Sequence, residues 1–155
     1  MKIDTATIGD AEELLALQKT AFHREAVFYD NFSITPLMET IDTYRTSFNE
    51  FTILKAIIDS RIIGSVRANT VGTTCYISRL VVLPVYQRQG IAGRLMRAIE
   101  KRLGDEVERL ELFTGAKSEG NIALYVKLGY RVFRTTENDG ITMVLLEKRR
   151  ERRTS

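Results

Sequence analysis

Hydrophobic positions along the chain follow two spacings, one typical of amphipathic helices and the other of half-buried strands. The helical spacing is clear where Ile91, Leu95 and Ile99 mark one face. The pattern predicts helices from Asp10 to near 23–26 and over 37–48, 90–103 and 118–128, and strands over 3–7, 51–59, 61–69, 73–84, 108–116, 130–136 and 141–148. The irregular aromatic stretch AVFYDNFSITPLMET separates the first two helices and is predicted to contain a loop.

Capping and turn residues fix several of these boundaries. Asp10, with Glu13 three residues later, is typical of a helix start with a capping box. A turn near Ser60 and Arg61 and another over 137–140 predict two β-hairpins, and Gly129 is a predicted helix C-cap. Pro84 ends its strand because proline cannot donate to a ladder. Strands interspersed with helices in this order predict an α/β fold with some antiparallel neighbours.

The length of 155 residues predicts one domain, over 1–147, followed by a basic tail over 148–155. The segment EKRRERRTS holds five Lys/Arg and two Asp/Glu, so 18 basic and 18 acidic residues remain elsewhere. The net charge of +3 is therefore a property of this tail. Because no aromatic interleaving or recognition motif accompanies it, the sequence does not favour a nucleic-acid partner.

Cysteine and histidine usage limits the remaining chemistry. Cys75 is the single cysteine, so no internal disulfide forms, and it is predicted to be a small buried residue on a strand. His23 is the single histidine, and the two make no ligand cluster, so we expect no metal. The sequence shows no signal-peptide pattern and no run long enough to span a membrane, which predicts a cytoplasmic protein without membrane contact.

The segment PVYQRQGIAGRLM, residues 84–96, joins a predicted strand to a predicted helix. The helix start offers free N–H groups, Gly90 permits close backbone approach, and Arg88 and Arg94 add positive charge. These features suit an anion such as a phosphate. The spacing matches neither a Walker loop nor a dinucleotide fingerprint. From these residues alone, an anion site and an ordinary capped turn are equally supported.

The predicted helix over 118–128 places Ser118, Asn121 and Tyr125 on one face, next to an apolar stripe with Leu124 and Leu128. Spacing alone favours plain solvent exposure of this polar face. A functional role for the tyrosine needs further evidence.

Two segments supply that evidence, because they resemble the GCN5-related N-acetyltransferase superfamily. RLVVLPVYQRQGIAGRLM resembles its acetyl-CoA-binding segment, Q/R-x-x-G-x-G/A after an apolar strand, and NIALYVKLGYRVF resembles its second segment. The likeness covers nearly the whole chain. It implies a mixed, mostly antiparallel central sheet flanked by helices and splayed after the fourth strand.

The resemblance also implies a donor, acetyl-CoA, and the residues that bind it. Leu80, Val81 and Val82 would pair with the pantetheine arm, and the backbone from Arg88 to Gly93 would hold the pyrophosphate. The full set implied is Leu80, Val81, Val82, Gln87, Arg88, Gln89, Gly90, Ile91, Ala92, Gly93, Arg94, Ser118, Asn121 and Tyr125. Ser118 departs from the asparagine of many members, so either Ser118 or Asn121 makes that contact.

In this family the tyrosine at the position of Tyr125 faces the acetyl-CoA sulfur, which implies that Tyr125 would donate a proton to the leaving thiolate or hydrogen-bond it. The implied reaction is direct acetyl transfer to a primary amine in a ternary complex. The acceptor remains open among small amines, amino acids, aminoglycosides and protein amino termini. The alternative is a non-catalytic acyl-CoA-binding sensor or assembly module. Homodimers are common in the family, so a homodimer is also an expectation.

An acceptor amine must lose a proton before it attacks the thioester, which calls for a base. Glu111 is the first candidate. The alternatives are Glu25, Asp30, Glu39, His23, or a water held by Ser78 or Thr114. Phe28, Tyr29 and Phe32 are predicted to bind the acceptor; they also suit packing of their own segment.

Overall fold

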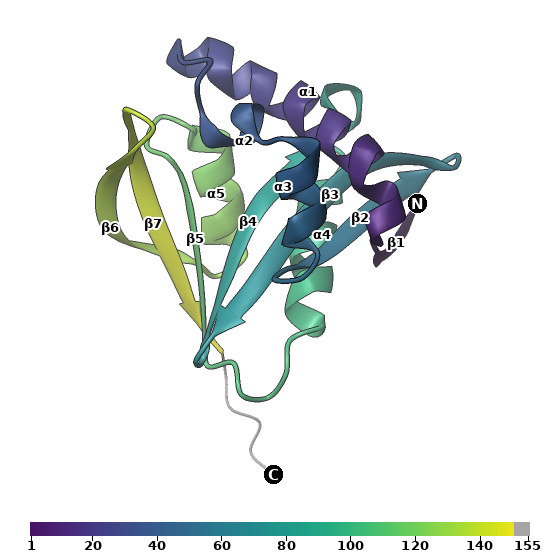
Figure 1. Ribbon diagram of the computed structural model, residues 1–155. Helices are drawn as coiled ribbons and strands as arrows, with labels where there is room; N and C mark the ends of the chain where they lie inside the picture. The colour runs from purple at the N-terminus through teal and green to yellow at the C-terminus, as the bar shows by residue number, and fades with distance from the viewer. Residues whose placement is uncertain (151–155) are drawn as a thin grey trace. The chain divides into compact units, whose positions relative to one another are not determined.

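The computed structural model describes residues 1–150, which divide into two compact units. One unit comprises Met1–Ala68 and Arg79–Arg102, and the other comprises Asn69–Ser78 and the chain from Leu103 onward. The elements, labelled in Figure 1, are β1 (Lys2–Thr5), η1 (Ile8–Asp10), α1 (Ala11–Tyr29), α2 (Thr35–Met38), α3 (Ile41–Ser47), β2 (Thr52–Ile58), β3 (Arg61–Val71), β4 (Thr74–Val82), η2 (Pro84–Tyr86), α4 (Ile91–Lys101), β5 (Arg109–Gly115), α5 (Glu119–Lys127), β6 (Arg131–Asn138) and β7 (Ile141–Arg149).

Seven strands hydrogen-bond in the order β1-β2-β3-β4-β5-β7-β6. The pairs β1–β2, β2–β3, β5–β7 and β6–β7 are antiparallel, whereas β4 and β5 run parallel. The register of β4 with β5 covers only Thr74–Tyr76 against Arg109–Glu111. The predicted mixed, mostly antiparallel sheet flanked by helices is confirmed, and its splaying after the fourth strand stays a prediction.

In the first unit, β3 is buried on both faces. Gly64 faces α4, because a Cβ built on it would lie 3.1 Å from Leu95 Cδ1. Arg67, an odd number of residues away on the same strand, faces α1 and hydrogen-bonds to Gln18. This double coverage explains why seven consecutive β3 residues, from Ile62 to Ala68, are buried without alternation.

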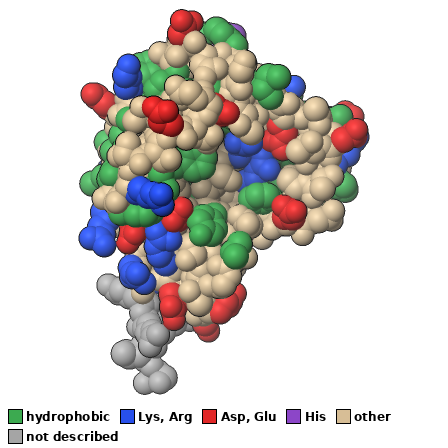
Figure 2. All heavy atoms as spheres, turned by 60° about the vertical axis from the view of Figure 1, so that its left-hand side comes forward, with side chains coloured by type: hydrophobic (Ala, Val, Ile, Leu, Met, Phe, Trp, Pro, Cys, Tyr) green, Lys and Arg blue, Asp and Glu red, His purple; other side chains and the backbone are tan. Residues whose placement is uncertain are grey.

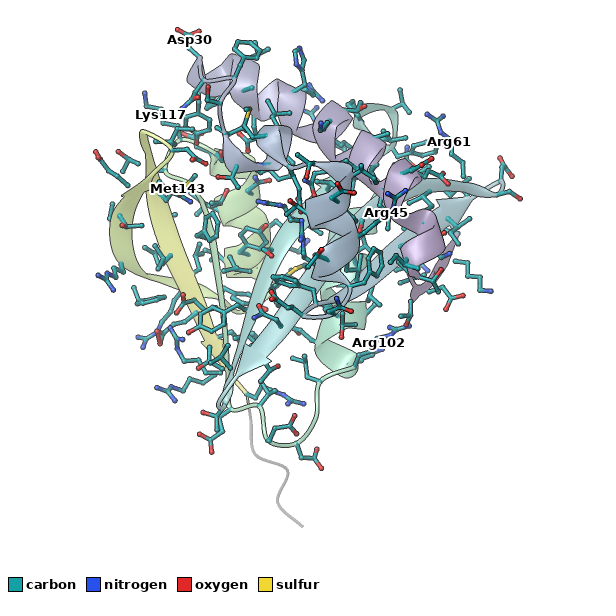
Figure 3. All side chains as sticks on the ribbon, in the orientation of Figure 1. Asp30, Arg45, Arg61, Arg102, Lys117 and Met143 are labelled. Atoms are coloured by element: carbon teal, nitrogen blue, oxygen red, sulfur yellow. The ribbon has the colours of Figure 1, made fainter. Side chains whose placement is uncertain are left out.

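The first two helices differ from the prediction. Helix α1 continues to Tyr29 and ends in a Schellman motif, in which Asp30 and Asn31 donate to Val27 and Ala26. Asp30 has a left-handed backbone with φ of 51° and lies at the end of α1 in Figure 3. Ala26 is fully buried, so the last turns of α1 are stabilised by contact with the core, and the helix continues beyond its predicted end.

The continuous helix predicted over 37–48 is wrong, since α2 and α3 are separated by Glu39 and Thr40. Glu39 adopts an extended conformation with ψ of 133°. Thr40 then caps α3, because its side-chain oxygen accepts from Thr43 N–H at 3.2 Å. Asp10 is the N-cap of α1, as predicted, but its side chain makes no capping bond in that helix. The short helix η1 precedes α1, and the Asp10 carboxylate accepts from Thr7 N–H at 2.9 Å. Glu13 instead accepts from Ile62 N–H.

In the second unit, β5, β7 and β6 form an antiparallel ladder. Helix α5 ends at Lys127, and the predicted capping glycine, Gly129, follows it. Gly129 has φ of 99°, and the N–H groups of Gly129 and Tyr130 close a Schellman motif. The β6–β7 turn is the tight pair Asp139–Gly140, with φ of 53° and 73°. On the face that Figure 2 brings forward, hydrophobic and charged side chains mix. The Arg109 guanidinium lies 5.0 Å from the Phe133 ring centroid.

The first residues of the predicted tail over 148–155 belong to the described part of the chain. Strand β7 runs to Arg149, and Arg150 Nη1 donates to the carbonyl oxygens of Gly104 and Val107 at 2.6 and 3.1 Å. The rest of the predicted tail, 151–155, lies outside the described residues. The extent of the single domain stays a prediction. Within 1–150, no helix has the length and apolar character needed to cross a membrane.

Candidate functional site

The turn between β4 and α4 presents backbone N–H groups at a helix start. Gly90 is the N-cap of α4 with φ of 78°, and Arg88 is also left-handed with φ of 64°. The first backbone bond across this turn runs from Arg94 N–H to Gly90 C=O at 3.2 Å. The earlier N–H groups of the helix have no intrahelical acceptor. A Cβ built on Gly90 would meet nothing within 4 Å, so the space over the turn is open to a ligand.

Gln87 anchors this turn to its surroundings. Its Nε2 donates to the Val82 carbonyl at 3.2 Å, and its Oε1 accepts from Arg24 Nη1 at 3.0 Å. The side chain therefore ties the end of β4 and helix α1 together. Arg88, Gln89 and Arg94 are exposed around the open N–H groups.

Strand β4 changes character at Arg79. This residue has φ of 53°, a left-handed backbone that is rare for a side-chain-bearing residue inside a strand. After it, Leu80 is half-buried, and Val81 and Val82 are buried. The three residues that the family resemblance places against the pantetheine arm therefore begin directly after a strained position.

In the second unit, α5 has one buried side chain, that of Tyr125. The plain solvent exposure favoured by the spacing is thus wrong for this tyrosine, which packs edge-on against Tyr130 with ring centroids 6.2 Å apart. Asn121 is exposed, and its Nδ2 donates to Thr114 Oγ1 at 3.3 Å. Ser118 is half-buried at the N-cap of the helix. The predicted shared face exists, although its members differ in exposure.

Glu111 lies on the other face of β5 from Thr114, because side chains alternate along a strand. Its carboxylate accepts from Arg109 Nη2 at 2.8 Å. Arg109 also forms an ion pair with Glu147 at 3.3 Å, which places Glu111 in a charge network on the face away from Asn121. This position gives Glu111 a structural partner and weakens its case as the base.

The three aromatic candidates lie on helix α1 or just after it. Phe28 and Tyr29 belong to α1, where their rings meet edge-on with centroids 5.0 Å apart, whereas Phe32 follows the helix. Phe28 and Phe32 are 61% and 53% exposed. The ring centroids of His23 and Phe32 are 5.7 Å apart. Phe28 and Phe32 therefore expose apolar side chains near the end of α1.

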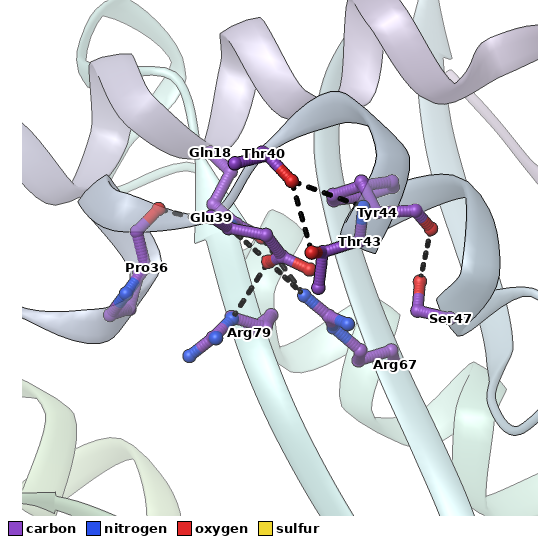
Figure 4. Close-up of polar contacts among 9 residues, drawn as sticks. All are labelled: Gln18, Pro36, Glu39, Thr40, Thr43, Tyr44, Ser47, Arg67 and Arg79. Carbon is purple, nitrogen blue, oxygen red and sulfur yellow. Dashed lines mark hydrogen bonds and ion pairs between the residues drawn. The ribbon is translucent and has the colours of Figure 1, made fainter.

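The structure brings together a buried ionic cluster that the sequence patterns did not indicate (Figure 4). Glu39 Oε1 accepts from Arg67 Nη2 at 2.7 Å and from Gln18 Nε2 at 2.9 Å, and lies 3.6 Å from Arg79 Nε. The Arg67 guanidinium is also held between the rings of Tyr44 and Phe51, at 5.2 and 5.1 Å. The sequence feature that could have indicated this cluster was Arg67, a charged residue inside the apolar run of β3.

The cluster holds its carboxylate ionised. Burial raises the pKa of Glu39, but the hydrogen bond from Gln18 and the charge of Arg67 outweigh it, so the pKa lies below its ordinary value of 4.5. Burial raises the pKa of Tyr44 to about 12, which keeps this phenol protonated. Burial, together with the charge of Arg67, lowers the pKa of Arg79. A carboxylate with a depressed pKa is a weak base, so Glu39 is not suited to take the amine proton.

The other base candidates lie on different elements. His23 and Asp30 are exposed on or after α1, and Glu25 is half-buried on the same helix. Ser78 is half-buried on β4. Over residues 1–150, the structure contains no group of three or more His, Cys, Asp or Glu side chains placed to hold a metal ion.

Comparison with known proteins gives a relative and several similar folds. The catalytic subunit of the N-terminal acetyltransferase B complex of Arabidopsis thaliana is 30% identical over 91 residues, 53% of this chain and 52% of that protein. The chain thus matches about half the length of this curated relative.

Solved structures match over almost the whole chain. PaiA N-acetyltransferase from Thermoplasma acidophilum, in complex with coenzyme A, has a TM-score of 0.78 at 18% identity, covering 97% of this chain and 100% of that one. Ribosomal-protein-alanine N-acetyltransferase from Brucella melitensis has a TM-score of 0.76 at 18% identity, covering 96% and 99%. At these identities the likeness shows the fold. The sequence model of the acetyltransferase (GNAT) family matches residues 12–130, and the chain belongs to that family.

Proposed function

We propose that the chain is an N-acetyltransferase that moves an acetyl group from acetyl-CoA to a primary amine by direct transfer in a ternary complex. The observation that carries the proposal is the open, glycine-capped turn before α4, within a chain that belongs to the acetyltransferase (GNAT) family. The family match supplies the reaction class, and the turn supplies the local chemistry for a phosphate-bearing donor.

The turn suits the diphosphate of the donor for electrostatic reasons. Backbone N–H groups at the start of α4 point along the helix axis, and the helix dipole places positive potential there. Arg88 and Arg94 are exposed and add to it. Because Gly90 has no Cβ, the phosphate oxygens can approach the backbone directly. The edge of β4 at Leu80–Val82 is assigned to the amide-rich arm of the donor.

Tyr125 is assigned as the acid that protonates the departing thiolate. The amine nitrogen bonds to the thioester carbonyl carbon, the carbon–sulfur bond breaks, and the sulfur takes the phenolic proton. The amine loses its proton to water or a base, and Tyr125 recovers a proton from solvent. A tyrosine hydroxyl carries an O–H group that can donate this proton or hydrogen-bond the sulfur.

The base is assigned to a water rather than to a carboxylate. Glu111 is engaged by Arg109, and Glu39 has a lowered pKa. The hydroxyl of Thr114 is buried on β5 and that of Ser78 is half-buried on β4, and either could order such a water. Phe28, Tyr29 and Phe32 are assigned to acceptor binding as an apolar surface.

The second candidate is an acyl-CoA-binding module without catalysis, which the open turn favours equally. It needs the N–H groups before α4 and no proton donor. The substitution Tyr125→Phe distinguishes the two candidates: the enzyme loses turnover and keeps donor binding, whereas a pure binding module has no turnover to lose.

The first experiment is calorimetric titration of the purified chain with acetyl-CoA, CoA and ATP. We expect micromolar binding of acetyl-CoA and little binding of ATP. Gly90→Glu places a carboxylate in the open space over the turn and should abolish binding. Its matched control is Gly72→Glu, because Gly72 also has a positive φ of 63° and open space around its missing Cβ, in the β3–β4 turn. If Gly90→Glu and Gly72→Glu bind acetyl-CoA with equal affinity, the turn at Gly90 does not bind the donor phosphates.

A cytoplasmic location and a homodimer belong to the same proposal. The single cysteine, Cys75, is buried and makes no disulfide, which suits a reducing compartment. Sedimentation of the purified chain at micromolar concentration measures the oligomeric state directly. A sedimentation coefficient that corresponds to a monomer would refute the proposed homodimer.

A further inference from the structure

The buried cluster around Glu39 carries more positive than negative charge. Arg67 and Arg79 contribute two cations, Glu39 contributes one anion, and Gln18 and the protonated Tyr44 are neutral. The Arg67 and Glu39 side chains are 6% and 5% exposed, and that of Arg79 is 19% exposed. A buried cation without a matching anion destabilises the fold, which suggests that a ligand supplies the missing negative charge.

Arg67 supplies the positive charge that neutralises the Glu39 carboxylate. It donates a 2.7 Å hydrogen bond to Glu39 Oε1, the oxygen that also accepts from Gln18. Arg79 Nε lies 3.6 Å from the same oxygen, beyond hydrogen-bond length, and is buried without a hydrogen-bond partner among the described residues. Arg67 Nε is likewise buried without a partner there. The second arginine is therefore not needed to neutralise Glu39.

The orientation of Arg79 shows where its donors are available. In Figure 4 its Nε faces Glu39, whereas its two terminal nitrogens extend away from the carboxylate. Such a guanidinium fork matches the two oxygens of a carboxylate. The backbone that carries it is left-handed, and a strained residue inside a strand is typical of functional sites. Arg79 also immediately precedes Leu80–Val82, the segment assigned to the donor.

We propose that Arg79, supported by Arg67, binds a carboxylate of the acceptor, so that the enzyme prefers amines that carry a nearby carboxylate. The inference rests on the proposed acetyltransferase function and narrows its substrate class. The carboxylate can be that of a free amino acid or that of an acidic side chain close to a peptide amino terminus. Glu39 and Gln18 position the two arginines, and the acceptor supplies the missing negative charge.

The test uses matched acceptor pairs and the full-length chain with acetyl-CoA, with thiol release as the assay. The first pair is phenylalanine and phenylalaninamide; the second is a peptide with Asp at position two and the same peptide with Asn. A charged hydrogen-bonded contact predicts a kcat/KM about tenfold to a hundredfold higher for the carboxylate member of the responding pair. Which pair responds identifies the source of the carboxylate.

Variants separate recognition from folding and from donor binding. Arg79→Gln should remove the preference within the responding pair, whereas Arg79→Lys should keep part of it, and both should bind acetyl-CoA as the wild type does. Arg45→Gln is the matched control, because Arg45 is an exposed arginine on α3 that pairs with Glu12 (labelled in Figure 3). It should leave the preference unchanged.

Acceptor binding is also measured without turnover, by calorimetric titration of the chain in the presence of CoA. If no amine is acetylated but the carboxylate members still bind and Arg79→Gln abolishes that binding, the catalytic proposal fails and the recognition site stands. If both members of each pair bind and react equally, or if Arg79→Gln keeps the preference, the carboxylate site is overturned while acetyl transfer is unaffected.

Discussion

Replacing Glu39 with Gln removes the anion that Arg67 and Arg79 share and leaves both guanidinium groups without it. With an effective dielectric constant of about 20, unit charges at the 2.7 Å and 3.6 Å separations from Arg67 and Arg79 attract by about 6 and about 5 kcal/mol. Both values exceed the free energy that the substitution costs. Each charge is spread over several atoms, which weakens the attraction, and the neutral amide of Gln avoids the desolvation cost of the carboxylate.

The net cost of removing one partner of a buried ion pair is about 3–5 kcal/mol. We expect Glu39→Gln to lower the free energy of unfolding by that amount and Tm by about 6–20 °C. Urea denaturation followed by circular dichroism measures the change. Glu12→Gln is the control, because the Glu12 side chain is 82% exposed and its ion pair with Arg45 is worth less than about 1 kcal/mol.

A second substitution tests whether the excess positive charge causes the loss. Adding Arg79→Met to Glu39→Gln removes one of the two uncompensated cations, so the double variant should be more stable than Glu39→Gln alone. A Glu39→Gln variant within about 1 kcal/mol of wild type would refute the reasoning, since it would mean that solvent already compensates both arginines.

Three further predictions concern stability. The pKa values of Glu39 and Glu147 lie below 4.5 in the folded chain, so the two carboxylates stabilise the fold fully above about pH 4.5. This stabilisation is lost as the pH falls through the folded pKa values. The free energy of unfolding of Glu39→Gln, measured over an acid titration, should therefore fall less steeply than that of the wild type. Gly64→Ala should cost about 1–3 kcal/mol in urea denaturation, because its Cβ would lie 3.1 Å from Leu95 Cδ1 and 3.2 Å from a backbone oxygen; an unchanged midpoint would mean that α4 shifts freely. Asp30→Gly should raise the free energy of unfolding by about 0.5–1 kcal/mol, because glycine adopts φ of 51° without steric cost, and a decrease would show that the aspartate carboxylate stabilises the end of α1.

The sequence by itself determined the elements whose cause is local. The strands, the helices α4 and α5, Gly129 after α5 and the glycine-capped turn at Gly90 match the structure, because each depends on side-chain periodicity or on a backbone conformation that glycine permits. The two family segments are likewise contiguous stretches of chain. Their likeness could therefore be read without knowledge of any long-range contact.

Only the tertiary structure decided where α1 ends, which helix residue is buried, and which charges meet. Helix α1 continues because Ala26 reaches the core, and Tyr125 is buried because the fold covers its face of α5. Glu39, Arg67 and Arg79 come from a loop and two strands. No spacing in the sequence relates them, because strand pairing and helix packing bring their side chains to one point. The anion-binding turn is thus local in origin, whereas the proposed carboxylate site exists only in the folded chain.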